Sequence, residues 1–230
     1  MTNNHENINN YQVWCEQWRE RFLKMDQNEL QNRLPELQVD EQYLSIVHFG
    51  RRFFIDRSSG EITLSDGTSI SDTTALQCQV SCSEKLNIYT LFGYVSENAV
   101  FQDNWVKFEK LKGMAPFAPA FQEGVVRPFA RMFDGKVEKL REAFQKLGAK
   151  ELSWSDAGYE FSAFACIPVR FLFWESDEEF PAQANLLFDA SATDFIHGES
   201  VVTIATIGLA RIAEAAGVEM DCGAFQVMYE

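Results

Sequence analysis

The sequence lacks the residue patterns on which most recognisable enzymes depend. No glycine-rich loop of a dinucleotide- or nucleotide-binding protein occurs, and neither His-Glu-x-x-His nor Gly-x-Ser-x-Gly is present. Histidine occurs only three times. These absences exclude the nucleotide-binding, zinc-protease and serine-hydrolase classes that such motifs define, and no other segment supplies a complete catalytic set.

Cysteine is too sparse and too scattered to build a metal centre or a disulfide framework. The five cysteines are an odd number, and the only close pair is Cys78-x-x-x-Cys82. Because an iron–sulfur cluster needs about four thiolate ligands, we expect five free thiols and no cluster. Reduced thiols are typical of the cytoplasm.

Positive charge and long hydrophobic runs are scarce as well. The net charge is −14, which disfavours nucleic acid and anionic membranes as partners, because both present negatively charged phosphates. The longest apolar stretch, Val201–Ala210, is much shorter than the roughly 20 residues that cross a bilayer. The first ten residues lack the basic start and apolar run of a signal peptide. We therefore expect a soluble cytoplasmic protein that binds neither nucleic acid nor membrane.

The chain does contain enough apolar sequence, 46% of its residues, to bury a core. Its patterns run in the order helices, strands, helices, strands and helix, which favours an α+β fold with a mainly antiparallel sheet, packed helices and a helical N-terminus. No linker divides the chain, so we expect a disordered terminus over residues 1–10 and a single domain over residues 11–230. The expected helices are Ile8–Met25, a short one between Asp26 and Pro35, Ser83–Val95, Phe117–Phe133, Gly135–Leu147 and Glu199–Ala216. The expected strands are Tyr43–Phe49, Arg52–Asp56, Glu61–Leu64, Thr74–Val80, Trp105–Glu109, Tyr159–Cys166, Val169–Trp174 and Ala184–Asp189.

Two of these helices carry particular expectations. A row of apolar residues at four-residue spacing comprises Phe117, Phe121, Val125, Phe129 and Phe133. Pro128 interrupts this row, so we expect a kinked helix or two successive helices, with the row in the core. The helix Glu199–Ala216 has only Arg211 and Glu214 as charges after its first residue. A helix that is apolar almost all round is expected to be buried.

Two aromatic-rich runs flank a short acidic turn in the second half of the chain. We expect Val169–Trp174 and Ala184–Asp189 to pair as antiparallel strands, in a register that the sequence leaves open. The period of two directs Phe171 and its alternate neighbours to the core. Arg170 and Trp174 then lie on the opposite face.

Arg170 and the acidic turn each allow a structural and a functional interpretation. An arginine on a largely apolar strand needs a partner, and the turn, Asp189 and Glu160 are available. We favour such an ion pair over an anion-binding arginine. The turn comprises Asp177, Glu178, Glu179, Phe180 and Pro181. We favour a solvated turn over a cation site or a docking patch.

Polar residues also surround the start of the expected C-terminal helix. Asp189 ends the preceding strand, and Asp194, His197 and Glu199 come after it. We favour helix capping, in which Asp194, His197 and Glu199 satisfy free N–H groups and the positive end of the helix dipole. The alternative is a divalent-metal site or an acid–base group. His48, which alternates with apolar residues on a strand, is expected to be half-buried and hydrogen-bonded.

Several motifs of the chain are distinctive. They are Trp174-Glu-Ser-Asp177-Glu-Glu-Phe180-Pro181-Ala-Gln-Ala-Asn-Leu-Leu-Phe188-Asp189, Phe195-Ile-His-Gly-Glu199-Ser-Val-Val, His48-Phe-Gly-Arg51-Arg-Phe, Tyr89-Thr-Leu-Phe-Gly-Tyr94, Trp105-Val-Lys-Phe108 and Phe117-Ala-Pro-Ala-Phe121. Over roughly residues 10–215 they resemble the bacterial and archaeal family catalogued as domain of unknown function 3786. Some relatives carry an added cysteine-rich segment like that of corrinoid iron–sulfur proteins, and this implies a link to anaerobic cofactor or one-carbon metabolism. The present chain lacks those cysteines, so the iron–sulfur role does not carry over.

We interpret the chain as a binding or accessory protein that recognises a partner protein or a small ligand without turnover. Neither a cofactor nor a metal is specified by the sequence. The candidate binding residues are Arg170, Trp174, Asp177, Glu178, Phe180, Asp189, His197 and Glu199. The alternative is a metal- or cofactor-dependent enzyme that uses Asp189, His197 and Glu199 near the start of the last helix.

Overall fold

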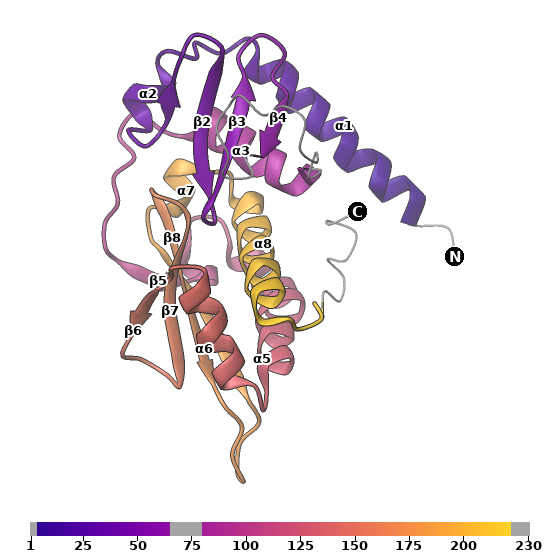
Figure 1. The fold of residues 1–230 in the computed structure, drawn as a ribbon, viewed down its shortest axis with the longest axis vertical. Coiled ribbons are helices and arrows are strands. Elements are labelled where there is room, and N and C mark those ends of the chain that lie inside the picture. The colour runs from indigo at the N-terminus through magenta and orange to yellow at the C-terminus, as the bar shows by residue number, and fades with distance from the viewer. Residues whose placement is uncertain (1–3, 65–79, 222–230) are drawn as a thin grey trace.

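The computed structural model describes residues 4–64 and 80–221, and it shows an α+β fold with two antiparallel sheets. The strand orders are β1-β2-β3-β4 and β5-β9-β8-β7-β6. In Figure 1 the smaller sheet lies at the top and the larger one at the lower left, with α8 running down the middle of the molecule beside α5 and α6. The predicted fold class is confirmed. Within the two described ranges, no helix is both long and apolar enough to cross a membrane.

The N-terminal half builds the smaller sheet and the helices that flank it. Its helices are α1 (Asn4–Phe22), α2 (Leu30–Arg33) and α3 (Cys82–Tyr94), and its strands are β1 (Gln38–Val39), β2 (Tyr43–His48), β3 (Arg51–Asp56) and β4 (Ile62–Leu64). Helix α1 begins inside the segment that the sequence predicts to be disordered, and it ends three residues before the predicted Met25. The predicted strand Thr74–Val80 lies outside the described residues, except for Val80, which belongs to no strand.

Helix α3 starts one residue earlier than predicted, because Ser81 rather than Ser83 precedes its first turn. The Ser81 hydroxyl accepts a hydrogen bond from the Glu84 N–H at 3.2 Å, and the Glu84 carboxylate accepts one from the Ser81 N–H at 2.9 Å. This reciprocal capping box satisfies two N–H groups that the helix itself leaves free.

The C-terminal half builds the larger sheet. Its strands are β5 (Trp105–Lys107), β6 (Lys150–Leu152), β7 (Ala157–Phe164), β8 (Ile167–Trp174) and β9 (Gln183–Asp189). Its helical segments are η1 (Phe108–Lys110), η2 (Ala115–Phe117), α4 (Ala118–Phe121), η3 (Gln122–Val126), α5 (Arg127–Phe133), α6 (Val137–Lys146), α7 (Ala192–Phe195) and α8 (Gly198–Ala216). The predicted pairing of β8 with β9 is confirmed, in a register that sets Trp174 opposite Gln183 and Val169 opposite Phe188.

The interrupted helix around Pro128 is resolved as α4 and α5 joined by the π-helical turn η3. Pro128 lies in the first turn of α5, a position where its missing N–H is best tolerated. Four members of the predicted core row are buried, namely Phe121, Val125, Phe129 and Phe133. Phe117 is the exception with 47% of its surface exposed, because it ends the 3₁₀ turn η2 before the helix proper begins.

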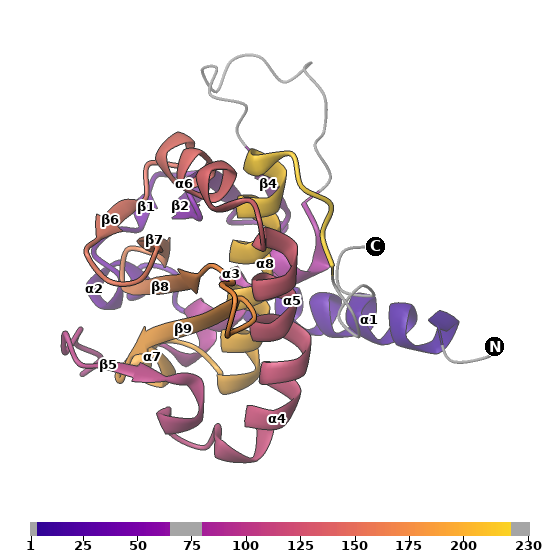
Figure 2. The same cartoon turned by 90° about the horizontal axis from the view of Figure 1, so that it is seen from below.

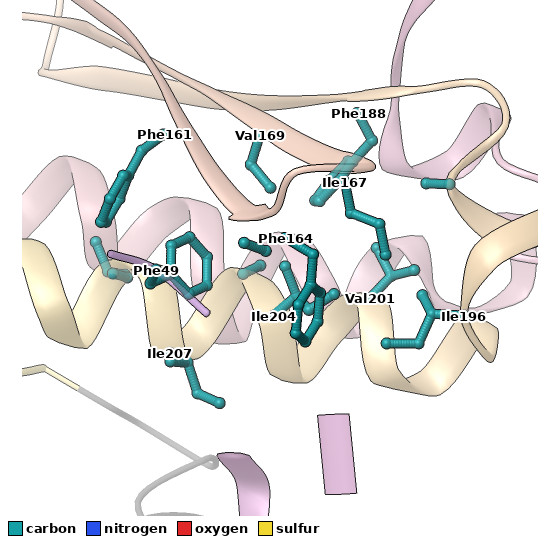
Figure 3. Packing of buried hydrophobic residues seen from close by; sticks show 14 of the residues in the cluster. Phe49, Phe161, Phe164, Ile167, Val169, Phe188, Ile196, Val201, Ile204 and Ile207 are labelled. Atoms are coloured by element: carbon teal, nitrogen blue, oxygen red, sulfur yellow. The ribbon is translucent and has the colours of Figure 1, made fainter. Parts of the chain in front are cut away.

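Helix α8 forms the centre of the core, as its lack of charge predicts. Figure 3 shows Phe49 and Phe161 beside α8, and the two rings have their centroids 4.9 Å apart. Gly208 allows this approach, since a Cβ built there would lie 2.7 Å from the Phe49 ring and 2.8 Å from the Phe171 ring. The helix ends at Ala216 and is capped by Gly217, whose φ of 62° places it in the left-handed region that favours glycine.

Candidate functional site

Two adjoining pockets lie where β8 and β9 leave the larger sheet, and both are lined by Trp174 and Gln183. We name them the edge pocket, with a volume of about 510 Å³, and the turn pocket, with a volume of about 310 Å³. Both volumes are of the size of ligand-binding sites in proteins. Trp174 and Gln183 form the last register pair of the two strands. Trp174 keeps 38% of its surface exposed.

The edge pocket lies between β9 and the helical segments that come after β5. It is lined by Lys107, Phe108, Glu109, Ala118, Phe121, Gln122, Val126, Trp174, Gln183, Ala184, Asn185 and Leu186. Phe108 and Phe121 are stacked with their centroids 4.1 Å apart, and both are buried. The polar lining consists of three amide side chains with one lysine and one glutamate. The pocket therefore combines an apolar wall with nearly neutral hydrogen-bonding groups.

The turn pocket is formed largely by the connection between β8 and β9, which projects as a long hairpin end at the bottom of Figure 1. It is lined by Asp156, Trp174, Glu175, Asp177, Phe180, Pro181 and Gln183. Oδ2 of Asp156 accepts a hydrogen bond from the Glu175 N–H at 2.8 Å, which fixes the start of the connection. One buried oxygen of Glu175, Oε1, has no hydrogen-bond partner among the described residues. Three carboxylates thus give this pocket a negative potential.

The acidic turn is held by its own first residue. Oδ1 of Asp177 accepts hydrogen bonds from the Glu179 N–H at 2.8 Å and from the Phe180 N–H at 2.7 Å, and these lower the pKa of its carboxyl. Glu178 is exposed, and so is Phe180 with 58% of its surface. Asp177 is therefore a turn-forming residue that also lines a pocket, and Phe180 is an exposed ring at the pocket's edge.

Arg170 is enclosed rather than free to bind an anion. Its Nε donates a hydrogen bond to Oε2 of Glu160 at 2.9 Å, so the structure selects Glu160 from the three predicted partners. Its guanidinium carbon lies 3.6 Å from the ring centroid of Trp105 and 5.2 Å from that of Trp154. The ion pair and the two rings account for Arg170 as a packing element of the outer sheet face. It lines neither the edge pocket nor the turn pocket.

Asp189 anchors the chain before β5 to the end of β9. Its side chain is 1% exposed, and its carboxylate accepts hydrogen bonds from the N–H groups of Gln102 at 3.1 Å, Asn104 at 2.9 Å and Ser191 at 3.0 Å. The Ser191 hydroxyl donates another. Burial opposes ionisation of Asp189, but these donors outweigh it, so its pKa is lowered. Asp189 is a structural anion rather than a free catalytic group.

His197 occupies the N-cap position of α8, but its side chain makes no capping hydrogen bond there, contrary to the capping prediction. Its ring packs against Tyr94 with the centroids 4.8 Å apart, and its Nδ1 lies 3.9 Å from Oε2 of Glu199. Glu199 lies in the first turn of the helix, where its negative charge matches the helix dipole. In residues 4–64 and 80–221, no group of three or more His, Cys, Asp or Glu side chains could hold a metal ion. The structure therefore does not assemble Asp189, His197 and Glu199 into a metal centre.

His48 is fully buried rather than half-buried. Its Nδ1 lies 2.9 Å from the carbonyl oxygen of Ala163, and its Nε2 lies 3.4 Å from the amide nitrogen of Asn87. These contacts are those of a neutral ring that donates from Nδ1 and accepts at Nε2. Burial lowers the pKa of His48 to about 4.

Of the sequence-predicted candidates, Trp174, Asp177 and Phe180 line the pockets. The others, which are Arg170, Glu178, Asp189, His197 and Glu199, do not. Sequence reasoning missed Gln183, Asn185 and the neighbours of Phe121 in α4 and η3. Gln183 and Asn185 had a detectable signal, because they alternate with apolar residues on a predicted strand. No sequence signal marked the pocket residues of α4 and η3, since their position depends on where the chain turns after β5.

The three cysteines within the described ranges, Cys15, Cys82 and Cys166, are free thiols, while Cys78 and Cys222 lie outside those ranges. Comparison with protein families gave a match over residues 26–211 to the family described as "Domain of unknown function (DUF3786)". The chain belongs to this family. The match confirms the resemblance carried by the short motifs, and it contains both pockets. Comparisons with curated proteins and with solved structures gave no match.

Proposed function

We propose that the protein is a binding or accessory protein whose ligand or partner occupies the two pockets around Trp174. The observation that carries this proposal is that Trp174 and Gln183 line both pockets. A single bound molecule can therefore contact both hollows around one partly exposed indole. Tryptophan side chains in concave sites are frequent anchors of binding, because they supply a large apolar surface together with an N–H donor.

The chemistry of the two pockets supports a ligand with two parts. The edge pocket offers amide side chains from Gln122, Gln183 and Asn185 above an apolar wall, which suits a neutral group with hydrogen-bond donors and acceptors. The turn pocket offers carboxylates from Asp156 and Glu175, which suits a cationic group. The net charge of the chain, −14, favours the approach of the same cationic group.

We place this activity in the cytoplasm as part of the proposal. Free thiols at Cys15, Cys82 and Cys166 suit a reducing compartment. The family resemblance adds a proposed link to anaerobic cofactor metabolism, for which cobalamin is a suitable probe. A ligand that binds only the folded protein raises its melting temperature, so a rise with cobalamin supports the link and an unchanged value contradicts it.

The proposal is tested by fluorine NMR of protein labelled with 5-fluorotryptophan. The chain has five tryptophans, and a Trp174→Phe variant assigns the resonance of interest. The probes are two libraries, one of small amides and alkylammonium compounds and one of random heptapeptides. We expect bound compounds to shift the Trp174 resonance more than that of Trp14, which is exposed on α1 and serves as the matched control. Compounds that bind while leaving the Trp174 resonance in place contradict the proposal.

A further inference from the structure

We propose that the free edge of β9 in the edge pocket accepts an extended peptide segment of a partner protein as an added β-strand. This inference rests on the proposed function of the Trp174 pockets and names the chemistry of the partner. Strand addition of this kind uses main-chain hydrogen bonds for affinity and pockets for alternate side chains for specificity.

Strand β9 has an unpaired stretch because its two neighbours differ in length. β8 pairs with it from Gln183 to Phe188, whereas β5 pairs with it only from Leu187 to Asp189. After Lys107 the chain turns away from the sheet to form η1. In the described part of the chain, residues 183–186 therefore have a strand on one side only. Figure 2 shows β9 between β8 and the short β5, with α4 beyond the end of β5.

The main chain of Ala184 points toward the missing strand. The Ala190 N–H donates to the Asn104 carbonyl at 2.8 Å, so even-numbered residues of β9 direct their N–H and C=O groups to the β5 side. In an antiparallel ladder this direction alternates from residue to residue. Ala184 therefore presents one donor and one acceptor on that side, and it lines the edge pocket. No other described strand pairs with it there.

The length of the free edge and the residues that surround it determine the length and the side-chain pattern of the added peptide. The stretch Gln183–Leu186 spans about 13 Å at the usual rise per residue, which matches about four residues of an added strand. Alternate side chains of such a strand meet the apolar wall that includes Phe121 and Val126. The intervening side chains lie alongside the amide of Asn185 and the indole of Trp174. We infer a segment in which every second residue is apolar.

The negative charge of the turn pocket indicates which residue the partner carries next to the paired stretch. Beyond Gln183 the edge pocket adjoins the turn pocket, with carboxylates from Asp156, Glu175 and Asp177. A cationic donor of a bound peptide can pair with carboxylates of this pocket. The inferred partner therefore carries a lysine or arginine beside the alternating apolar residues.

The test selects random heptapeptides against the full chain and measures the dissociation constants of the strongest binders by fluorescence polarisation. We expect the selected peptides to alternate apolar residues and to carry Lys or Arg at one end. Ala184→Pro should weaken binding at least tenfold, because proline removes the N–H donor at the edge while leaving the ladder with β8 intact. Ala184→Ser keeps that donor and should weaken binding much less than Ala184→Pro does. The melting temperature of each variant reports on its fold.

A second measurement needs no altered protein. N-methylation of the peptide at alternate residues removes the N–H groups that face β9, so one set of positions should abolish binding and the intervening set should not. The inference is overturned if no peptide binds, or if neither Ala184→Pro nor any N-methylation weakens binding. If small compounds shift the Trp174 resonance but no peptide binds as a strand, this inference is overturned and the proposed function stands. If nothing shifts that resonance, the proposed function itself fails.

Discussion

Adjacent residues of β8 face opposite sides of the larger sheet, so their replacement by alanine separates a binding side chain from a core side chain. Phe173 is fully buried, and its ring centroid lies 6.0 Å from that of Phe129. Trp174, the next residue, is 38% exposed and lines both pockets. We predict that Phe173→Ala lowers the free energy of unfolding much more than Trp174→Ala does.

The magnitudes follow from burial. Phe173→Ala should cost about 4 kcal/mol, within the range of about 3–5 kcal/mol for a phenylalanine in a closed core, where a cavity remains. A fully buried tryptophan removes about 200 Å² from water, and the exposed fraction of Trp174 reduces this to about 120 Å². At about 25 cal/mol per Å², and with allowance for a compact unfolded state, Trp174→Ala should cost about 2 kcal/mol.

Urea unfolding, followed by circular dichroism, measures both values. The denaturant dependence of the unfolding free energy should stay equal in the two variants, which shows that the unfolded states are comparable. If Trp174→Ala destabilises the protein as much as Phe173→Ala does, Trp174 is a structural residue. The exposure of its indole would then not indicate a binding role.

Three further predictions concern the buried groups. His48 should make the unfolding free energy depend on pH, because its pKa in the folded protein is about 4, below the unfolded value of about 6.5. The stability contributed by the neutral His48 is therefore complete above pH 6.5. It falls by up to about 3 kcal/mol on acidification to pH 4. Urea titrations of His48→Gln should lack this part of the pH dependence, and an identical dependence in the variant contradicts the assignment. Gly208→Ala should destabilise by about 1–2 kcal/mol, since overpacking against Phe49 exceeds the gain in helix propensity; a stabilised variant in thermal unfolding refutes the close approach. Asp189→Asn should cost about 2 kcal/mol at pH 7, because an amide cannot accept all four hydrogen bonds, and a neutral change in urea unfolding contradicts its anchoring role.

Local patterns were sufficient to predict most helices and strands, because each depends on nearby residues. The pairing of β8 with β9 followed from two alternating runs joined by a short turn. The burial of α8 followed from its lack of charge. The position of Pro128 indicated the interruption between α4 and α5, but the π-helical form of η3 did not follow from it. Element boundaries shifted where a cap lay one or two residues away, as at Ser81.

The roles of Asp189 and Arg170 and the position of the edge pocket depend on tertiary contacts, which local sequence patterns do not predict. The role of Asp189 depends on the N–H groups of Gln102 and Asn104, which lie more than eighty residues earlier in the chain. The partner of Arg170 depends on the register that sets it opposite Glu160. The edge pocket depends on the point at which the chain leaves β5, and no local pattern marks that point. Trp174 was predicted as a candidate because a tryptophan beside an acidic turn, on the strand face opposite the core residues, is visible in the sequence itself.

The most direct test of the central claim measures the affinity of a selected heptapeptide for Trp174→Ala and for Trp14→Ala. Both tryptophans are exposed, but only Trp174 lines the pockets. We predict that Trp174→Ala weakens binding at least tenfold in a variant whose circular dichroism shows a folded protein, while Trp14→Ala leaves the dissociation constant unchanged. Unchanged affinity in folded Trp174→Ala, or an equal loss in Trp14→Ala, contradicts the assignment of the binding site to the Trp174 pockets.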